Sequence, residues 1–151
     1  MNIQKLTAIV VLMCIVSSAT GQGLNQVLLA YLDYDEFHKQ FVARCNVEYS
    51  DKVPALRTAI EHWSSINLPA VRDLQLVLNE RLIQQGIPAS EVASRAAATA
   101  AKVNAFMLGG LPRVSPSELR DMCSGQYALQ LTKPEMDYVS LLQRARAEVQ
   151  K

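Results

Sequence analysis

The sequence lacks an excess of charge of either sign. Its 151 residues include 15 lysines and arginines against 14 aspartates and glutamates. Proteins that bind nucleic acid usually gather a basic excess on one face, and proteins held on anionic lipid by charge need a similar excess. We therefore expect that nucleic acid is not a partner and that net charge does not hold the protein on a membrane.

The chain also lacks an apolar run long enough to cross a bilayer. The N-terminal apolar stretch, residues 6–16, is about half of the roughly 20 residues that a membrane-spanning helix requires. It follows Lys5 and precedes a run of small residues, which is the order of a secretory signal peptide. We predict a cleavable signal peptide over residues 1–21, cut after Ala19 or Gly21, and no stable membrane insertion afterwards. The mature protein is then exported, to the periplasm or to the medium.

Cysteine is scarce, and the three that occur support export. Removal of the signal peptide also removes Cys14 and leaves Cys45 and Cys123. Two remaining cysteines in a small domain of an oxidising compartment usually form a disulfide. No Cys-x-x-Cys motif points to redox or metal chemistry instead. We predict a Cys45–Cys123 disulfide.

Catalytic and cofactor motifs are absent as well. The sequence has no His-Glu-x-x-His zinc motif, no Cys-x-x-Cys-His haem motif and no Gly-x-Ser-x-Gly nucleophile motif. We expect His38 and His62 to be ordinary surface or boundary residues. Secreted chorismate mutases resemble the chain in size, helicity and disulfide. Their active sites need several arginines, whereas the first helical region here has only His38, Lys39 and Arg44 as basic residues, so the chain does not match this class of enzyme. We predict no catalytic residue, metal or cofactor, and thus no enzyme.

Helical periodicity is what the sequence does contain. Apolar residues recur at spacings of three and four along most of the chain, and no stretch shows sustained two-residue alternation. A mature chain of about 130 residues suits one domain with one core. We predict an all-α fold over residues 22–151, a compact bundle of five to six helices tied by the disulfide.

Element boundaries are marked by proline, glycine and capping residues. Residues 24–45 form one kinked helix or two, with an interruption near Asp33. Pro69 either kinks a long helix that runs to Gln85 or begins a new one. Residues 86–88, Gly-Ile-Pro, end that element.

The next helix is expected over residues 90–108. Its alanine-rich run at residues 95–101 favours helix and carries few large side chains, so neighbouring helices can approach closely. Its inward residues are expected to be Val92, Ala96, Val103, Phe106 and Met107.

Two later segments read as helix starts. Ser115 stands one residue and Thr132 two residues before a proline, and each is followed three residues later by a glutamate, Glu118 or Glu135. This is the pattern of a capping box, in which the hydroxyl and the carboxylate satisfy free backbone N–H groups. We predict that one helix begins at each.

Three features carry a resemblance to known proteins: Cys45, the segment Trp63–Asn67, and Cys123. In this pattern the chain resembles small exported helical proteins of Gram-negative bacteria, which implies a periplasmic address. We expect Trp63 to be a core anchor and Asn67 to cap the element near Pro69.

A disulfide-linked helical domain without catalytic motifs is consistent with two functions. The first is binding of another protein, as by an immunity-type inhibitor or an envelope adaptor. Its candidate interface is formed by Tyr31, Tyr34 and Phe37, with residues 109–114 as a second candidate patch. The alternative is a carrier of a small apolar ligand or lipid, held in a cavity beside the alanine-rich helix.

Overall fold

The structure, a computed structural model, describes residues 22–149 and confirms the all-α fold. No strand occurs among these residues. The predicted signal peptide, residues 1–21, lies outside the described part. The α-helices are α2 (Gln22–Leu29), α3 (Tyr34–Glu48), α4 (Val53–Gln84), α5 (Ala89–Gly110), α6 (Pro116–Asp121), α7 (Tyr127–Leu131) and α8 (Tyr138–Val149). Shorter turns connect them: the 3-10 helices Ser50–Lys52, Leu111–Arg113 and Pro134–Met136, and a π-helical turn, Met122–Gln126.

The N-terminal helical region is two helices. Residues 30–33 separate α2 from α3, and the Asp33 carboxylate accepts a hydrogen bond from the backbone N–H of Glu36 at 3.0 Å. This side chain caps α3 and satisfies one of the donors that a helix N-terminus leaves free.

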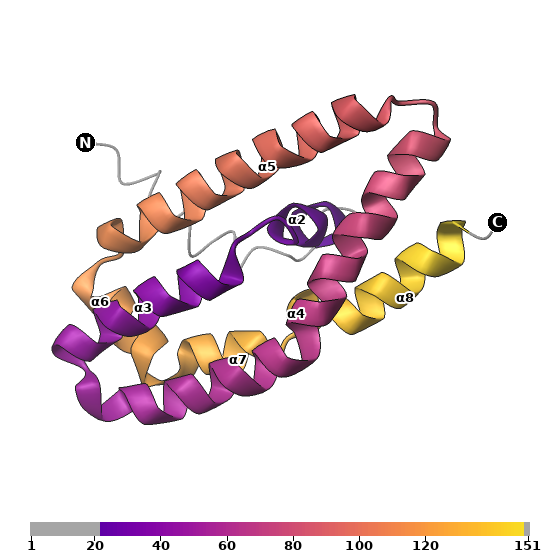
Figure 1. Ribbon diagram of the computed structural model, residues 1–151. Coiled ribbons are helices and arrows are strands. Elements are labelled where there is room, and N and C mark those ends of the chain that lie inside the picture. Colours follow the sequence, from indigo (N-terminus) through magenta and orange to yellow (C-terminus); the bar gives the residue numbers. More distant parts are fainter. Residues whose placement is uncertain (1–21, 150–151) are drawn as a thin grey trace.

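The helix that contains Pro69 is continuous. α4 runs from Val53 to Gln84 with Pro69 inside it, and Figure 1 shows it bending about half-way along. Proline has no N–H for the carbonyl four residues earlier, and its ring crowds that carbonyl, so a bend is expected there. Gly86, with φ +90°, ends the segment as predicted.

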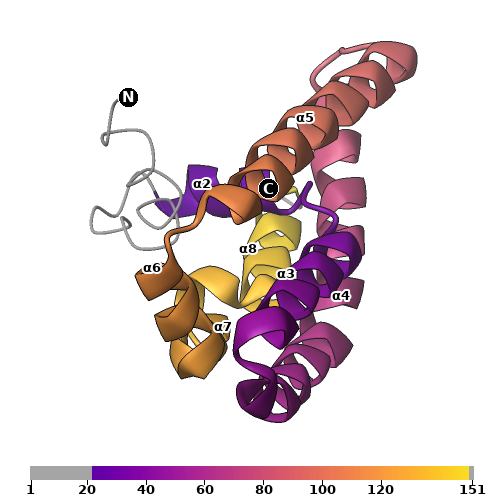
Figure 2. The same ribbon diagram turned by 90° about the vertical axis from the view of Figure 1, so that its left-hand side faces the viewer.

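α4 organises the packing. It contacts α3, α5, α7 and α8, and Trp63 in its first half is a buried core anchor, as predicted. In Figure 2, α6 and α7 lie on one side of the molecule and α3 and α4 on the other. The core lies between these helices.

Asn67 has a role that the sequence did not indicate. Its side chain is buried, its Nδ2 donates to the Trp63 carbonyl at 3.3 Å, and its Oδ1 accepts from the Tyr138 N–H at 2.8 Å. Tyr138 is the first residue of α8. Asn67 therefore caps α8 from across the core, and the prediction that it caps a segment near Pro69 is wrong.

The two expected capping boxes have different outcomes. Ser115 forms the predicted box with Glu118 at the start of α6. Thr132 does not cap a helix: the 3-10 helix Pro134–Met136 follows Lys133 and has no side-chain cap, and the Thr132 hydroxyl donates to the Leu129 carbonyl. Asp137, the residue before α8, has a capping side chain instead, since its carboxylate accepts from the Ser140 N–H at 3.0 Å.

The Cys45–Cys123 disulfide is present, with Cα atoms 5.7 Å apart. It joins α3 to the π-helical turn that follows α6. Both residues are buried in the core. The bond therefore ties the N-terminal part of the described chain to its C-terminal third.

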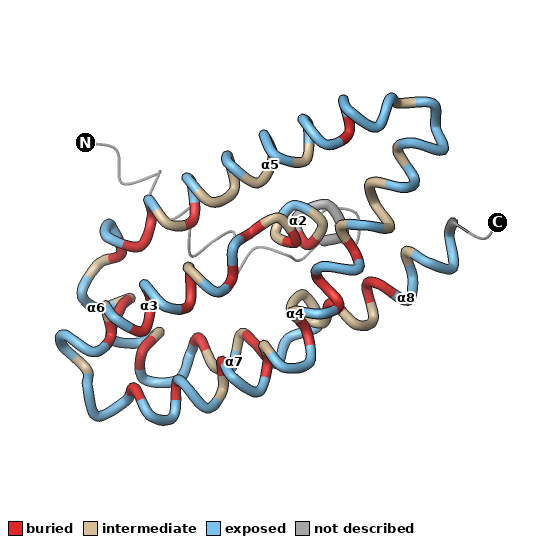
Figure 3. Tube along the Cα trace, viewed as in Figure 1, coloured by how far each residue is buried: buried red, intermediate tan, exposed pale blue. Residues whose placement is uncertain are grey.

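α5 is the least buried of the long helices. Its buried residues are Val92, Met107 and Gly110, and Figure 3 shows most of its length exposed. Phe106 is 44% exposed, so the prediction that it points into the core is wrong. The small side chains of the alanine-rich run give neighbouring helices little surface to cover.

Candidate functional site

The predicted aromatic interface does not lie on the surface. Tyr34 and Phe37 are 3% and 1% exposed and belong to the core, while Tyr31 is half-buried. An interface made of these three side chains is therefore wrong. Helix α3 turns the face that carries Tyr34, Phe37 and Phe41 inward against the rest of the bundle. In the second candidate patch, residues 109–114, half of the residues are buried.

The aromatic residues instead form a buried, hydrogen-bonded cluster. His38 Nε2 lies 2.8 Å from Tyr127 Oη, and the hydroxyl groups of Tyr34 and Tyr138 lie 2.7 Å apart. Trp63 Nε1 donates to the Met136 carbonyl at 2.9 Å. These bonds satisfy polar groups that would otherwise be costly to bury.

Burial keeps this cluster uncharged. Desolvation lowers the pKa of His38 to about 4, and it raises the pKa of the Tyr34, Tyr127 and Tyr138 hydroxyls. The imidazole and the phenols are therefore neutral near pH 7. His38 is buried, which corrects the expectation that it is a surface or boundary residue; His62 is exposed.

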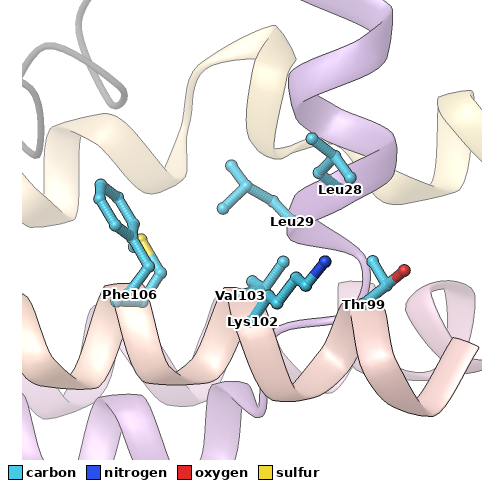
Figure 4. A pocket seen from close by; sticks show the side chains of 7 residues that line it. Leu28, Leu29, Thr99, Lys102, Val103 and Phe106 are labelled. Atoms are coloured by element: carbon cyan, nitrogen blue, oxygen red, sulfur yellow. The ribbon is translucent and has the colours of Figure 1, made fainter.

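A groove of about 390 Å³ opens between α2 and α5. Figure 4 shows Leu28 and Leu29 extending from α2 toward side chains that rise from α5. The α5 wall is formed by Thr99, Lys102, Val103, Phe106 and Met107. Five of the seven lining residues are apolar, and the exposed Leu28 and Phe106 stand among them.

Polar side chains hold the two walls of this groove in place. Asn104 on α5 accepts from the Asp33 N–H at 2.7 Å and donates to the Tyr31 carbonyl at 3.3 Å, so it fastens the segment that follows α2. Gln75 on α4 donates to the Ala30 carbonyl. From the other side, Gln26 donates to the Pro134 carbonyl at 3.3 Å. The groove is thus a preformed feature of the packing.

Neither a protein-family model nor a curated protein nor a solved structure matches the chain. Function is therefore inferred from the geometry of the molecule itself. None of the helices in the described part of the chain is both long and apolar enough to span a membrane. Residues 22–149 also hold no group of three or more metal-ligating side chains.

A second hollow, of about 340 Å³, lies between α3 and α4. The edge of His38 lines it together with Lys39, Arg57 and Glu61. Charges of both signs are present there, so no single ligand chemistry follows from it. The groove between α2 and α5 has the more specific lining.

The residues of this groove could not be identified from the sequence. Phe106 has the same spacing as the inward residues of α5, and Leu28 has that of the inward residues of α2. Periodicity alone gives no sign that these side chains border an open space. The alanine-rich run, residues 95–101, contributes only Thr99 to the lining, so it does not mark the groove either.

Proposed function

We propose that the protein is an exported, non-catalytic binding protein whose α2–α5 groove holds a small apolar ligand. The observation that carries the proposal is the groove itself, with its apolar lining and its volume of about 390 Å³. Ligand sites are typically concave, mostly apolar and about 300–1,000 Å³ in volume. The bonds made by Asn104, Gln75 and Gln26 support the proposal, because a preformed site loses little free energy in becoming ordered.

Export is part of the same proposal. The disulfide supports an oxidising compartment, the periplasm or the medium, because such bonds persist there. The predicted signal peptide and the resemblance to small exported proteins of Gram-negative bacteria agree with this address.

Binding of N-phenyl-1-naphthylamine, a neutral apolar dye, tests the ligand site. We expect saturable binding and a rise in dye fluorescence. Leu28→Ser combined with Phe106→Ser should weaken binding at least tenfold, because apolar contact of order 1 kcal/mol is lost at each position.

The matched control is Leu76→Ser combined with Ile83→Ser. These residues are also exposed and apolar, but they lie outside the groove on α4. The control should bind the dye as the native protein does. Equal loss in both double variants, or no saturable binding by the native protein, would contradict the proposal.

Binding of another protein is the second candidate. Leu76 is 67% exposed and lies two helical turns from Ile83, which is 46% exposed. Apolar side chains on one exposed face of α4 are suited to an immunity-type or adaptor interface. This candidate predicts that the α4 double variant loses a protein partner while the groove double variant retains it.

A further inference from the structure

The charges around the α2–α5 groove point to the kind of ligand it holds. α2 contains no charged residue, and in α5 the segment from Ala96 to Gly110 contains Lys102 as its single charged residue. Lys102 lines the groove. The groove therefore combines an apolar surface with one positive charge and no negative charge on either wall.

Lys102 is not neutralised by its own helix. Positions three and four residues away hold Ala98, Thr99, Ala105 and Phe106, so no carboxylate is placed to pair with it along α5. Within the described residues it forms none of the ion pairs of the molecule. Its ammonium group is thus available to an anion at the groove.

Thr99, the other polar side chain of the lining, already donates its hydroxyl proton in a hydrogen bond. The Thr99 hydroxyl donates to the Arg95 carbonyl at 2.9 Å. Lys102 is consequently the side chain of this lining that can donate to an acidic head group. One such donor fits a ligand with one acidic group.

The volume limits the apolar part of the ligand. A cavity of about 150 Å³ holds a benzene molecule of six carbons. By proportion, a groove of about 390 Å³ holds on the order of 15 carbons. This amount corresponds to one alkyl chain.

We infer that the groove binds a free single-chain carboxylate, with its alkyl chain along Leu28, Leu29, Val103 and Phe106 and its carboxylate at Lys102. The inference rests on the proposed function and specifies the ligand of the same site.

Calorimetric titration with three twelve-carbon probes below their micelle concentrations tests it: laurate, dodecanol and dodecyltrimethylammonium. Laurate should bind most tightly, and the cationic probe most weakly. Affinity for alkyl carboxylates should rise about fourfold for each added CH₂ up to the capacity of the groove. Because Lys102 is exposed, its contribution is modest and screened by salt.

Lys102→Gln isolates the head-group contact. It should weaken laurate binding about two- to fivefold at low salt and leave dodecanol binding unchanged. Lys102→Arg should restore the affinity for laurate, and Lys39→Gln, which removes a lysine exposed on α3, should have no effect.

The outcomes separate the two proposals. Equal affinity for laurate and dodecanol, with no effect of Lys102→Gln, would overturn the inference about the carboxylate and leave the apolar site standing. Absence of binding by all three probes and by the naphthylamine dye would overturn both.

Discussion

His38 shows how burial changes the chemistry of a single side chain. It is 4% exposed, and its Nε2 lies beside the Tyr127 hydroxyl. Because water cannot solvate an imidazolium there, its pKa falls to about 4. In the unfolded chain the pKa is about 6.5, so the unfolded state takes up a proton at a higher pH than the folded state does.

Stability should therefore fall as the pH falls below 6.5. The contribution of His38 is complete above the unfolded pKa and is lost progressively toward the folded pKa of about 4. Between pH 7 and pH 5 we expect a loss of about 2 kcal/mol in the free energy of unfolding. Urea titrations followed by the fluorescence of Trp63, the single tryptophan, measure it.

His38→Gln should remove most of this pH dependence, because glutamine can bond to Tyr127 without titrating in this range. His62→Gln, at an exposed position, should retain it. A His38→Gln protein that loses stability between pH 7 and pH 5 as steeply as the native protein would contradict the assignment.

At the scale of elements, the segment from α6 to α7 is a helix interrupted at Gly125. This residue has φ +129° and ψ −13°, outside the helical region, within the π-helical turn that carries Cys123. Residues with a Cβ adopt this conformation at considerable cost. Gly125 therefore allows the chain to change direction next to the disulfide.

Gly125→Ala should destabilise the protein by about 1–2 kcal/mol through backbone strain. An added Cβ has nothing within 4 Å at Gly125 and likewise at Gly109, so steric contact is equal at the two positions. Gly109 lies within α5, and there alanine should be neutral or stabilising by up to about 1 kcal/mol. Thermal unfolding midpoints compare the two variants, and equal shifts would refute the assigned role of Gly125.

At the scale of the whole molecule, the disulfide secures contacts between distant parts of the chain. Cys45 and Cys123 are 78 residues apart. The chain-entropy model assigns about 4.5 kcal/mol to closing a loop of this size, against a net stability of about 5–15 kcal/mol for a typical small protein. Loss of the bond is therefore expected to remove a large share of the stability of the fold.

Replacing both cysteines by alanine should lower the free energy of unfolding by about 2–5 kcal/mol. Urea titrations with and without a thiol reductant provide the comparison. Reductant should shift the midpoint of the native protein toward that of the double variant and leave the double variant unchanged. If reductant does not change the urea midpoint of the native protein, the disulfide does not stabilise the fold.

Features that depend on neighbouring residues were determined by the sequence itself. Helical periodicity reports contacts three and four residues apart, so it predicted the all-α fold. The Ser115 capping box and the glycine that ends α4 are likewise local, and both are present. The Cys45–Cys123 disulfide is not local, but it could be predicted because these are the two cysteines that lie outside the predicted signal peptide.

Features that depend on how helices cross were decided by the tertiary structure. Tyr34 and Phe37 lie in the core, and Asn67 caps α8, because α3, α4 and α8 meet there. The α2–α5 groove is open because Asn104 holds the segment after α2 against α5, while the mostly apolar side chains of the two walls leave space between them. Helical spacing specifies which residues share a face of a helix. That face becomes part of the core only if a second helix packs against it. Where no helix packs against it, the face remains open to a ligand.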